Sequence, residues 1–256
     1  MNPAGKTYEI SGLEVFLAEK LPALKKLREA GPKIVVNVAG HSVDDYVTGA
    51  GRIAADDAVD AIELNVSCPN VGDGLTFGTD PRLLKELITH VRRAVPQRCK
   101  LVVKLSPNVG DSTATAGAAI EGGADILSMI NTYTAMSIDI NKKKPRLANG
   151  TGGLSGPAVR PLAVCLVQRV CREVARDAGV PIIGMGGIQY WQDAVEFLLA
   201  GASGLAVGTA LFVDPATPIT ILDGLAQYLA DQGCGSLEEI IGAVELKGST
   251  PRAPYP

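Results

Sequence analysis

The chain alternates short apolar runs, rich in β-branched residues, with loops and longer amphipathic segments. Runs that are apolar throughout are typical of strands buried on both faces of a parallel sheet. The pattern predicts six strands, over residues 33–39, 61–66, 100–105, 126–131, 180–185 and 204–208. It also predicts helices over residues 15–27, 42–55, 80–95, 111–121, 158–178, 191–199 and 218–231.

Capping residues mark where two helices begin. Asp80 precedes Pro81, which places a capping side chain directly before a proline at the first helical position. The apolar residues that follow form one stripe: Leu84, Leu87, Ile88, Val91 and Val95. Ser236 and Glu239 have capping-box spacing, which predicts a last short helix.

Alternating strands and helices indicate a parallel sheet covered by helices, either an open doubly wound sheet or a (β/α)8 barrel. Glycines follow the last two strands, at 184–187 and at Gly208. They favour a barrel, because its phosphate site lies after the last strands, where backbone N–H groups approach the anion. Tight turns without a ligand would have the same pattern.

Six strands are two fewer than a barrel needs, and the first 32 residues offer only the helical segment. We therefore predict a (β/α)8 TIM barrel that is incomplete at its N-terminus in this chain. It forms a single domain over residues 1–248. Residues 249–256, with three prolines, form a frayed tail.

The composition excludes several classes of protein. Apolar residues make up 46% of the chain and charged residues 20%, which excludes a disordered protein. The net charge of −3 provides no basic excess for binding nucleic acid. No apolar run is long enough to span a bilayer. Five cysteines without metal-ligand spacing indicate a cytoplasmic protein with reduced thiols and no metal site.

Cys68 is the most distinctive candidate for chemistry. It lies just beyond a strand, between Ser67 and Pro69, where packing places few demands on the residue type. A thiol there can act as a nucleophile or a base once its thiolate is stabilised. The other four cysteines are interpreted as small core residues: Cys99, Cys165, Cys171 and Cys234.

Lys104 ends a strand that should be buried, so its ammonium either has an anionic partner or extends out to water. A partnered lysine could face an electron-rich cofactor ring or form a Schiff base, as in an aldolase. Asn131 and Thr132 end the next strand in the same way. The long segment after them, 133–153, is interpreted as a lid over the site.

These segments together resemble the dihydroorotate dehydrogenase family, and specifically its NAD-linked class 1B. The resemblance covers about residues 12–212. It rests on NVAG (37–40), ELNVSCPNV (63–71), FGTDP (77–81), VKLSPNV (103–109), MINT (129–132), ANGTGGLSGPA (148–158), IIGMGGI (182–188) and AVGT (206–209).

The resemblance implies an FMN enzyme of pyrimidine synthesis that oxidises (S)-dihydroorotate to orotate. Cys68 would be the base that removes the C5 proton while hydride leaves C6 for the flavin. Asn65, Asn70, Asn131 and Thr132 would bind the substrate. The flavin ring would be lined by Asn37, Asn65, Lys104, Ile130 and Gly156, and its phosphate held by Gly186, Gly187, Gly208 and Thr209.

The resemblance also implies a partner, an iron–sulfur flavoprotein subunit that carries FAD and a [2Fe–2S] cluster, in a homodimer or heterotetramer. This chain itself has no Fe–S ligand spacing. The family's first two βα units have no counterpart here. The alternative hypothesis is therefore a truncated or degenerate, non-catalytic barrel that binds a phosphate ligand or a partner subunit.

Overall fold

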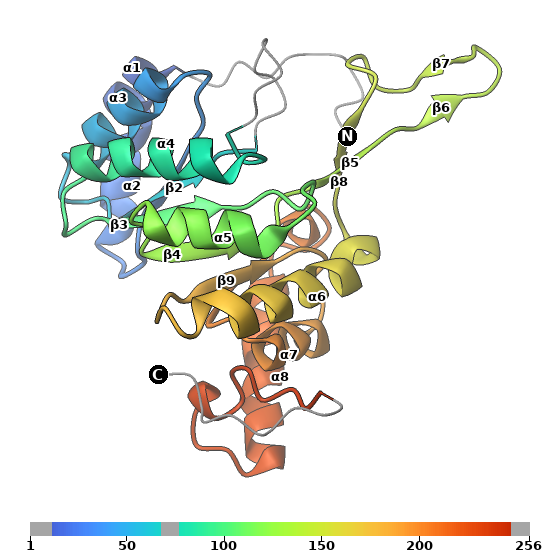
Figure 1. Ribbon diagram of the computed structural model, residues 1–256. Coiled ribbons are helices and arrows are strands. Elements are labelled where there is room, and N and C mark those ends of the chain that lie inside the picture. Colours follow the sequence, from blue (N-terminus) through green and yellow to red (C-terminus); the bar gives the residue numbers. More distant parts are fainter. Residues whose placement is uncertain (1–11, 68–76, 247–256) are drawn as a thin grey trace.

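A computed structural model describes residues 12–67 and 77–246 of the chain. Its centre is a six-stranded parallel sheet whose strands follow one another in chain order (Figure 1). The strands are β1 (Val35–Val38), β2 (Ala61–Asn65), β3 (Lys100–Lys104), β4 (Ile126–Met129), β9 (Ile182–Met185) and β10 (Gly204–Ala206). All six predicted strands are thus confirmed, each one to three residues shorter than predicted.

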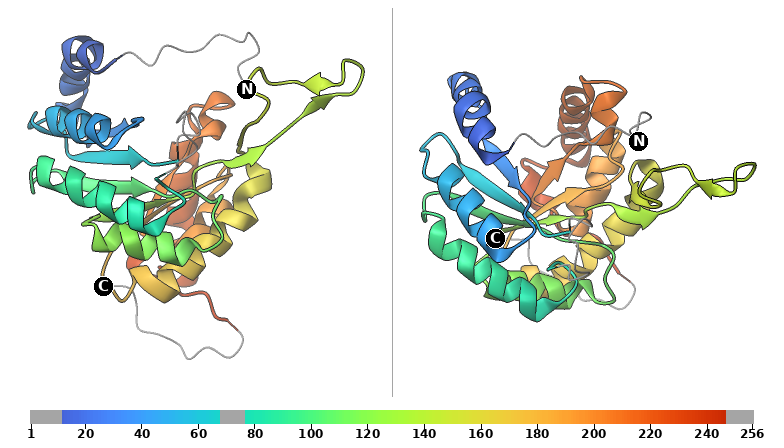
Figure 2. Two further views of the ribbon diagram at one scale, coloured as in Figure 1. Left: turned by 45° about the horizontal axis from the view of Figure 1, so that its top comes forward. Right: turned by 90° about the horizontal axis from the view of Figure 1, so that it is seen from above.

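Helices cover the outer face of this sheet and precede or follow the strands (Figure 2). They are α1 (Leu13–Val15), α2 (Leu21–Arg28), α3 (Val43–Ala54), α4 (Pro81–Ala94), α5 (Ser112–Glu121), α6 (Arg160–Val170), α7 (Trp191–Ala200) and α8 (Thr217–Gln232). Two π turns, η1 (Phe16–Lys20) and η3 (Cys171–Ala175), join or extend them, and η2 (Pro157–Val159), η4 (Thr209–Phe212) and η5 (Leu237–Glu239) are 3-10 turns.

The strand order identifies the architecture as part of a barrel. A doubly wound sheet reverses its strand order and carries helices on both faces, whereas this sheet does neither. The sheet curls about an axis with its helices outside, as in a (β/α)8 barrel that remains open between β1 and β10 (Figure 2). The predicted incomplete barrel is therefore confirmed.

The core lies between the sheet and its helices. On α4 the predicted stripe is fully buried at Leu84, Leu87, Ile88 and Val91. Burying each such side chain stabilises the fold by about 1.5–3 kcal/mol. The carboxylate of Asp80 accepts hydrogen bonds from the backbone N–H groups of Arg82 and Leu83 at 2.8 and 3.1 Å, which confirms the predicted cap.

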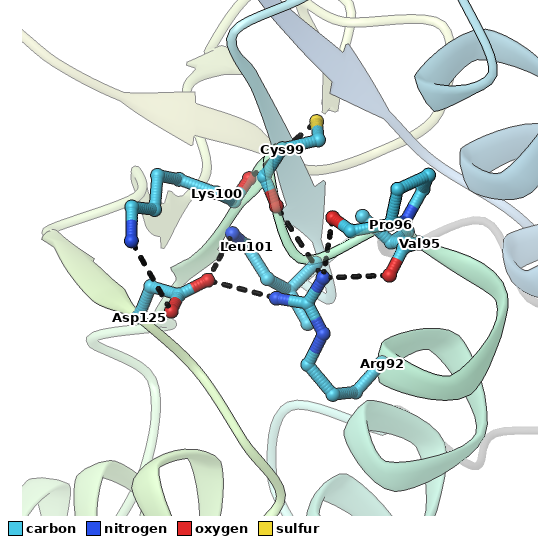
Figure 3. Close-up of polar contacts among 7 residues, drawn as sticks. All are labelled: Arg92, Val95, Pro96, Cys99, Lys100, Leu101 and Asp125. Atoms are coloured by element: carbon cyan, nitrogen blue, oxygen red, sulfur yellow. Dashed lines mark hydrogen bonds and ion pairs between the residues drawn. The ribbon is translucent and has the colours of Figure 1, made fainter.

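A partly buried ion pair joins α4 to the amino ends of β3 and β4 (Figure 3). Arg92 Nη1 lies 2.8 Å from Asp125 Oδ2, which also accepts a hydrogen bond from the N–H of Leu101 at 2.7 Å. The second guanidinium nitrogen donates to the carbonyl oxygens of Val95, Pro96 and Cys99. This network lies at the end of the barrel where residues contribute stability rather than chemistry.

The concave face of the sheet is open. On β1, Val36 and Val38 are buried against the helices, while Val35 and Asn37 point the other way and are exposed. Side chains would fill this face in a closed barrel, but here Val35 remains 54% exposed.

The segment interpreted as a lid is instead an arm that extends away from the sheet (Figures 1 and 2). Its base pairs β5 (Tyr133–Ala135) with β8 (Gly152–Leu154), and its outer part pairs β6 (Ile138–Asp139) with β7 (Lys144–Pro145). Backbone pairing holds both parts extended, which corrects the expectation that this segment covers the site. No helix within the described ranges is long and apolar enough to cross a membrane.

Candidate active site

Polar side chains gather where β2, β3 and β4 end. The register pairs Asn65 with Lys104, and Lys104 with Ser128, so the three residues form one row across neighbouring strands. Asn131 and Thr132 follow directly after β4. The carboxyl ends of parallel strands are where barrels hold their active sites, so this row is the candidate site.

Three of the predicted substrate-binding residues are held together by their own hydrogen bonds. Asn131 Nδ2 donates to Asn65 Oδ1 at 2.9 Å, and the N–H of Thr132 donates to Asn131 Oδ1 at 2.9 Å. The N–H of Ser67 also donates to Asn65 Oδ1, at 3.4 Å. Asn65 Oδ1 thus accepts two hydrogen bonds, which leaves Nδ2 as the donor of this side chain.

Tyr46 and Asn108 support this group, although neither was identified from the sequence as a site residue. The Tyr46 hydroxyl donates to the backbone oxygen of Asn65 at 2.7 Å. Asn108 Nδ2 donates to the carbonyl of Thr132 at 3.0 Å, and Asn108 Oδ1 accepts from the N–H of Thr134 at 2.9 Å. Asn108 therefore fixes the start of the arm beside the site.

Lys104 has an anionic partner, Glu63, which sequence reasoning did not assign to the site. Lys104 Nζ lies 4.0 Å from Glu63 Oε2. Asn37 Nδ2 donates to the same carboxylate oxygen at 2.6 Å, and Ser128 Oγ donates to Oε1 at 2.7 Å. Of the two expectations for Lys104, the structure supports the partnered cation. The motif around 63–71 contained Glu63, but its contacts come from strands distant in sequence.

Glycines with positive φ form a second part of the site, where the segment after β9 meets the residue before η2. Gly156, Gly186 and Gly187 have φ of 92°, 125° and 82°, a region that side chains rarely permit. A Cβ on Gly187 would lie 2.7 Å from the carbonyl oxygen of Gly156, so the close approach of the two backbones requires glycine at position 187. A Cβ on Gly186 would lie 3.5 Å from Ile130 Cγ1, which places Ile130 beside this loop.

The last strand delivers Gly208 and Thr209 to the same edge. Ala206 pairs with Met185, so the segments that follow β9 and β10 begin side by side. A Cβ on Gly208 would meet nothing within 4 Å, so this backbone borders open space. The open backbone at Gly208, beside the glycines that follow β9, leaves room for an anion such as a phosphate group.

Asp193 braces the glycine segment. Its Oδ2 accepts from the N–H groups of Gln189 and Tyr190, both at 2.9 Å, and its Oδ1 forms an ion pair with Arg160. Arg160 Nε also lies 3.2 Å from Glu196. The charge of this arginine is engaged by two carboxylates, so backbone groups remain the main donors toward a phosphate.

Two predicted residues, Cys68 and Asn70, lie outside the described residues. Asn37, which was predicted to line a flavin, is exposed on the concave face.

Tyr133, directly after Asn131 and Thr132, is partly buried, and burial raises the pKa of its hydroxyl. Within residues 12–67 and 77–246, no three His, Cys, Asp or Glu side chains gather closely enough to hold a metal ion.

The curled sheet and the groups at its carboxyl end define a TIM-barrel enzyme site. A family model described as dihydroorotate dehydrogenase matches residues 5–229. This chain therefore belongs to the dihydroorotate dehydrogenase family, as the motifs suggested.

Named relatives agree with this assignment. The chain is 46% identical over 236 residues to the catalytic subunit of dihydroorotate dehydrogenase B (NAD(+)) from Bacteroides thetaiotaomicron, covering 92% of this chain and 75% of that protein. It is 46% identical to the Alkaliphilus metalliredigens protein of that name over 91% of this chain and 74% of the relative. For the Geotalea daltonii protein the values are 44%, 92% and 74%. The family is flavin-dependent, and the words "catalytic subunit" imply that these relatives work with another subunit.

Proposed function

We propose that this chain is the catalytic subunit of an NAD-linked dihydroorotate dehydrogenase, which oxidises (S)-dihydroorotate to orotate in de novo pyrimidine biosynthesis. Family membership supports this function over a non-catalytic barrel. The observation that carries the proposal is the row of Asn65, Lys104 and Ser128 beside the fixed amide of Asn131.

The proposed cofactor is FMN, and the residues present fit it. The phosphate would lie against the backbone of Gly186, Gly187, Gly208 and Thr209, and the structure leaves open space beside Gly208. Lys104, Asn37, Asn65, Ile130 and Gly156 would line the ring. When bound, FMN accepts the hydride that leaves C6 of the substrate.

The substrate is a ring with a carboxylate and amide groups, so it needs both donors and acceptors. Asn65 offers its Nδ2 donor, and Asn131 and Thr132 lie beside it. Asn70 is proposed as a further contact. Cys68 is proposed as the base that takes the C5 proton, which is acidified by the adjacent carbonyl. Its ordinary pKa of about 8.5 suits a base once the thiolate is stabilised.

Lys104 acts as a fixed cation in this scheme. Its ion pair with Glu63 is formed by the charged ammonium, whereas a Schiff base forms from the neutral amine. The pair therefore favours a cation that stabilises negative charge on the ring over an aldolase lysine.

We further propose that electrons pass to a partner subunit, an iron–sulfur flavoprotein with FAD and a [2Fe–2S] cluster, and that this chain assembles as a homodimer or as a heterotetramer. The thiols of Cys99, Cys165 and Cys234 are free, as expected for the cytoplasm, which is the proposed location.

An anaerobic visible spectrum tests the function directly. The purified chain is incubated with FMN, freed of excess cofactor, and mixed with dihydroorotate. We expect a flavin band that bleaches on addition of substrate. Lys104→Ala should retain less FMN, while Lys85→Ala, on the outer helix α4, should retain as much as wild type. If FMN does not bind, or if a bound band does not bleach, the proposal is wrong.

A further inference from the structure

One carboxylate connects four strands on the concave face. Glu63 lies on β2 and contacts Asn37 on β1, Lys104 on β3 and Ser128 on β4. Its side chain is only 15% exposed, and Ser128 is fully buried. Within the described part of the chain, Glu63 is also the only charged partner that the structure gives Lys104.

The position of Glu63 places it below the ligand groups rather than among them. Asn65 lies two residues further along the same face of β2, which corresponds to a rise of about 6.6 Å. Lys104 is level with Asn65 but directs its ammonium back toward Glu63. Glu63 therefore reaches the ligand level only through the side chains that it holds.

Glu63 also determines the orientation of Asn37. A carboxylate only accepts hydrogen bonds, so the Asn37 amide must direct Nδ2 toward Glu63. Its Oδ1 is then left as an acceptor, suited to an N–H group such as those on the edge of a flavin or a pyrimidine ring. The same carboxylate thus fixes one cation and one acceptor.

We propose that Glu63 is a positioning residue that holds Lys104 and Asn37 and sets the reduction potential of the bound flavin. This inference rests on the proposed function. The negative charge of Glu63 offsets the positive charge of Lys104. The site therefore stabilises the negatively charged reduced flavin, relative to the oxidised flavin, less than Lys104 alone would. Without the carboxylate, Lys104 would act uncompensated in a partly buried site where charges are weakly screened.

The test is the Glu63→Gln variant, which keeps the shape and one acceptor oxygen but removes the charge. Wild type and variant are loaded with FMN, and their potentials are measured anaerobically against a dye of known potential. We expect the equilibrium to move about tenfold toward reduced FMN, which is about 30 mV for a two-electron couple. Glu121→Gln is the matched control, because Glu121 pairs with Lys85 on the helical outer face. Its potential should equal that of wild type.

The Glu63→Asp variant separates electrostatics from simple packing. It keeps a negative charge beside Lys104 but displaces the hydrogen bonds from Asn37 and Ser128, so its potential should stay within about twofold of wild type in equilibrium terms. A tenfold shift in this variant would overturn the proposal, and it serves as the test if Glu63→Gln does not fold. An unchanged potential in Glu63→Gln, with wild type still reduced by dihydroorotate, would overturn this inference alone. A wild-type chain that binds no FMN would overturn the proposed function as well.

Discussion

At the scale of single residues, each amide in the site is oriented by a neighbour, and this decides which atom faces a ligand. Asn65 Oδ1 accepts hydrogen bonds from Asn131 and Ser67, so the group left to this side chain is the Nδ2 donor. Asn37 Nδ2 donates a hydrogen bond to Glu63, so the group left to this side chain is the Oδ1 acceptor. Because the protein's own groups hold these amides, little ordering of the side chains would oppose ligand binding.

Cys68 is the residue on which the proposed proton transfer depends. Cys68→Ser should bind FMN normally but reduce it about 10²–10⁴ times more slowly near neutral pH, because a serine hydroxyl is a far weaker acid than a thiol. Stopped-flow reduction of the bound flavin by dihydroorotate measures this rate. Cys165→Ser, which changes an exposed cysteine on α6, is the matched control. Equal rates in the two variants would remove Cys68 as the base.

At the scale of elements, carboxylates tie helices to strands. Asp60, just before β2, accepts from the N–H of Ile34 at 2.8 Å, pairs with Arg28 on α2 at 3.0 Å, and lies 3.4 Å from Lys33. The hydrogen bond from Ile34 is the main cause that lowers the pKa of Asp60, and the nearby Lys33 and Arg28 add to it. One side chain thereby attaches the first helical segment to the edge of the sheet.

The lowered pKa makes this attachment dependent on pH. A carboxyl with a depressed pKa contributes stability above its unfolded value, and the contribution disappears as pH falls through the folded value. Asp60→Asn should therefore lower the free energy of unfolding by about 1–2 kcal/mol at pH 7. The gap to wild type should begin to narrow near pH 4, the ordinary pKa of an aspartate, and should close as pH falls below the lowered pKa of Asp60. Urea unfolding across this range measures the gap.

Asp57→Asn is the control for this prediction, because the Asp57 side chain is 92% exposed and pairs only at the surface with Arg98. Such surface pairs contribute little to stability. If the gap for Asp60→Asn stays constant with pH, its charge is not the source of the stability.

At the scale of the whole molecule, the sequence predicted the elements better than it predicted their contacts. The six strands and the α4 stripe were predictable because burial leaves a periodic apolar pattern. The arm was not predicted as strands, since β5 to β8 are two or three residues long and mostly exposed. Glu63 was overlooked as a site residue because its partners come from β1, β3 and β4, and only the register brings them together.

The agreement between strand order and chain order has a consequence for how the molecule opens. Each strand pairs with the strands nearest to it in sequence, apart from the arm between β4 and β9, so separation can start at either edge and proceed inward. Amide hydrogens of β1 and β10 should therefore exchange with deuterium first, and those of β3 and β4 last. Mass spectrometry of pulse-labelled peptides would show this gradient, whereas uniform protection would mean that the six strands open as one unit.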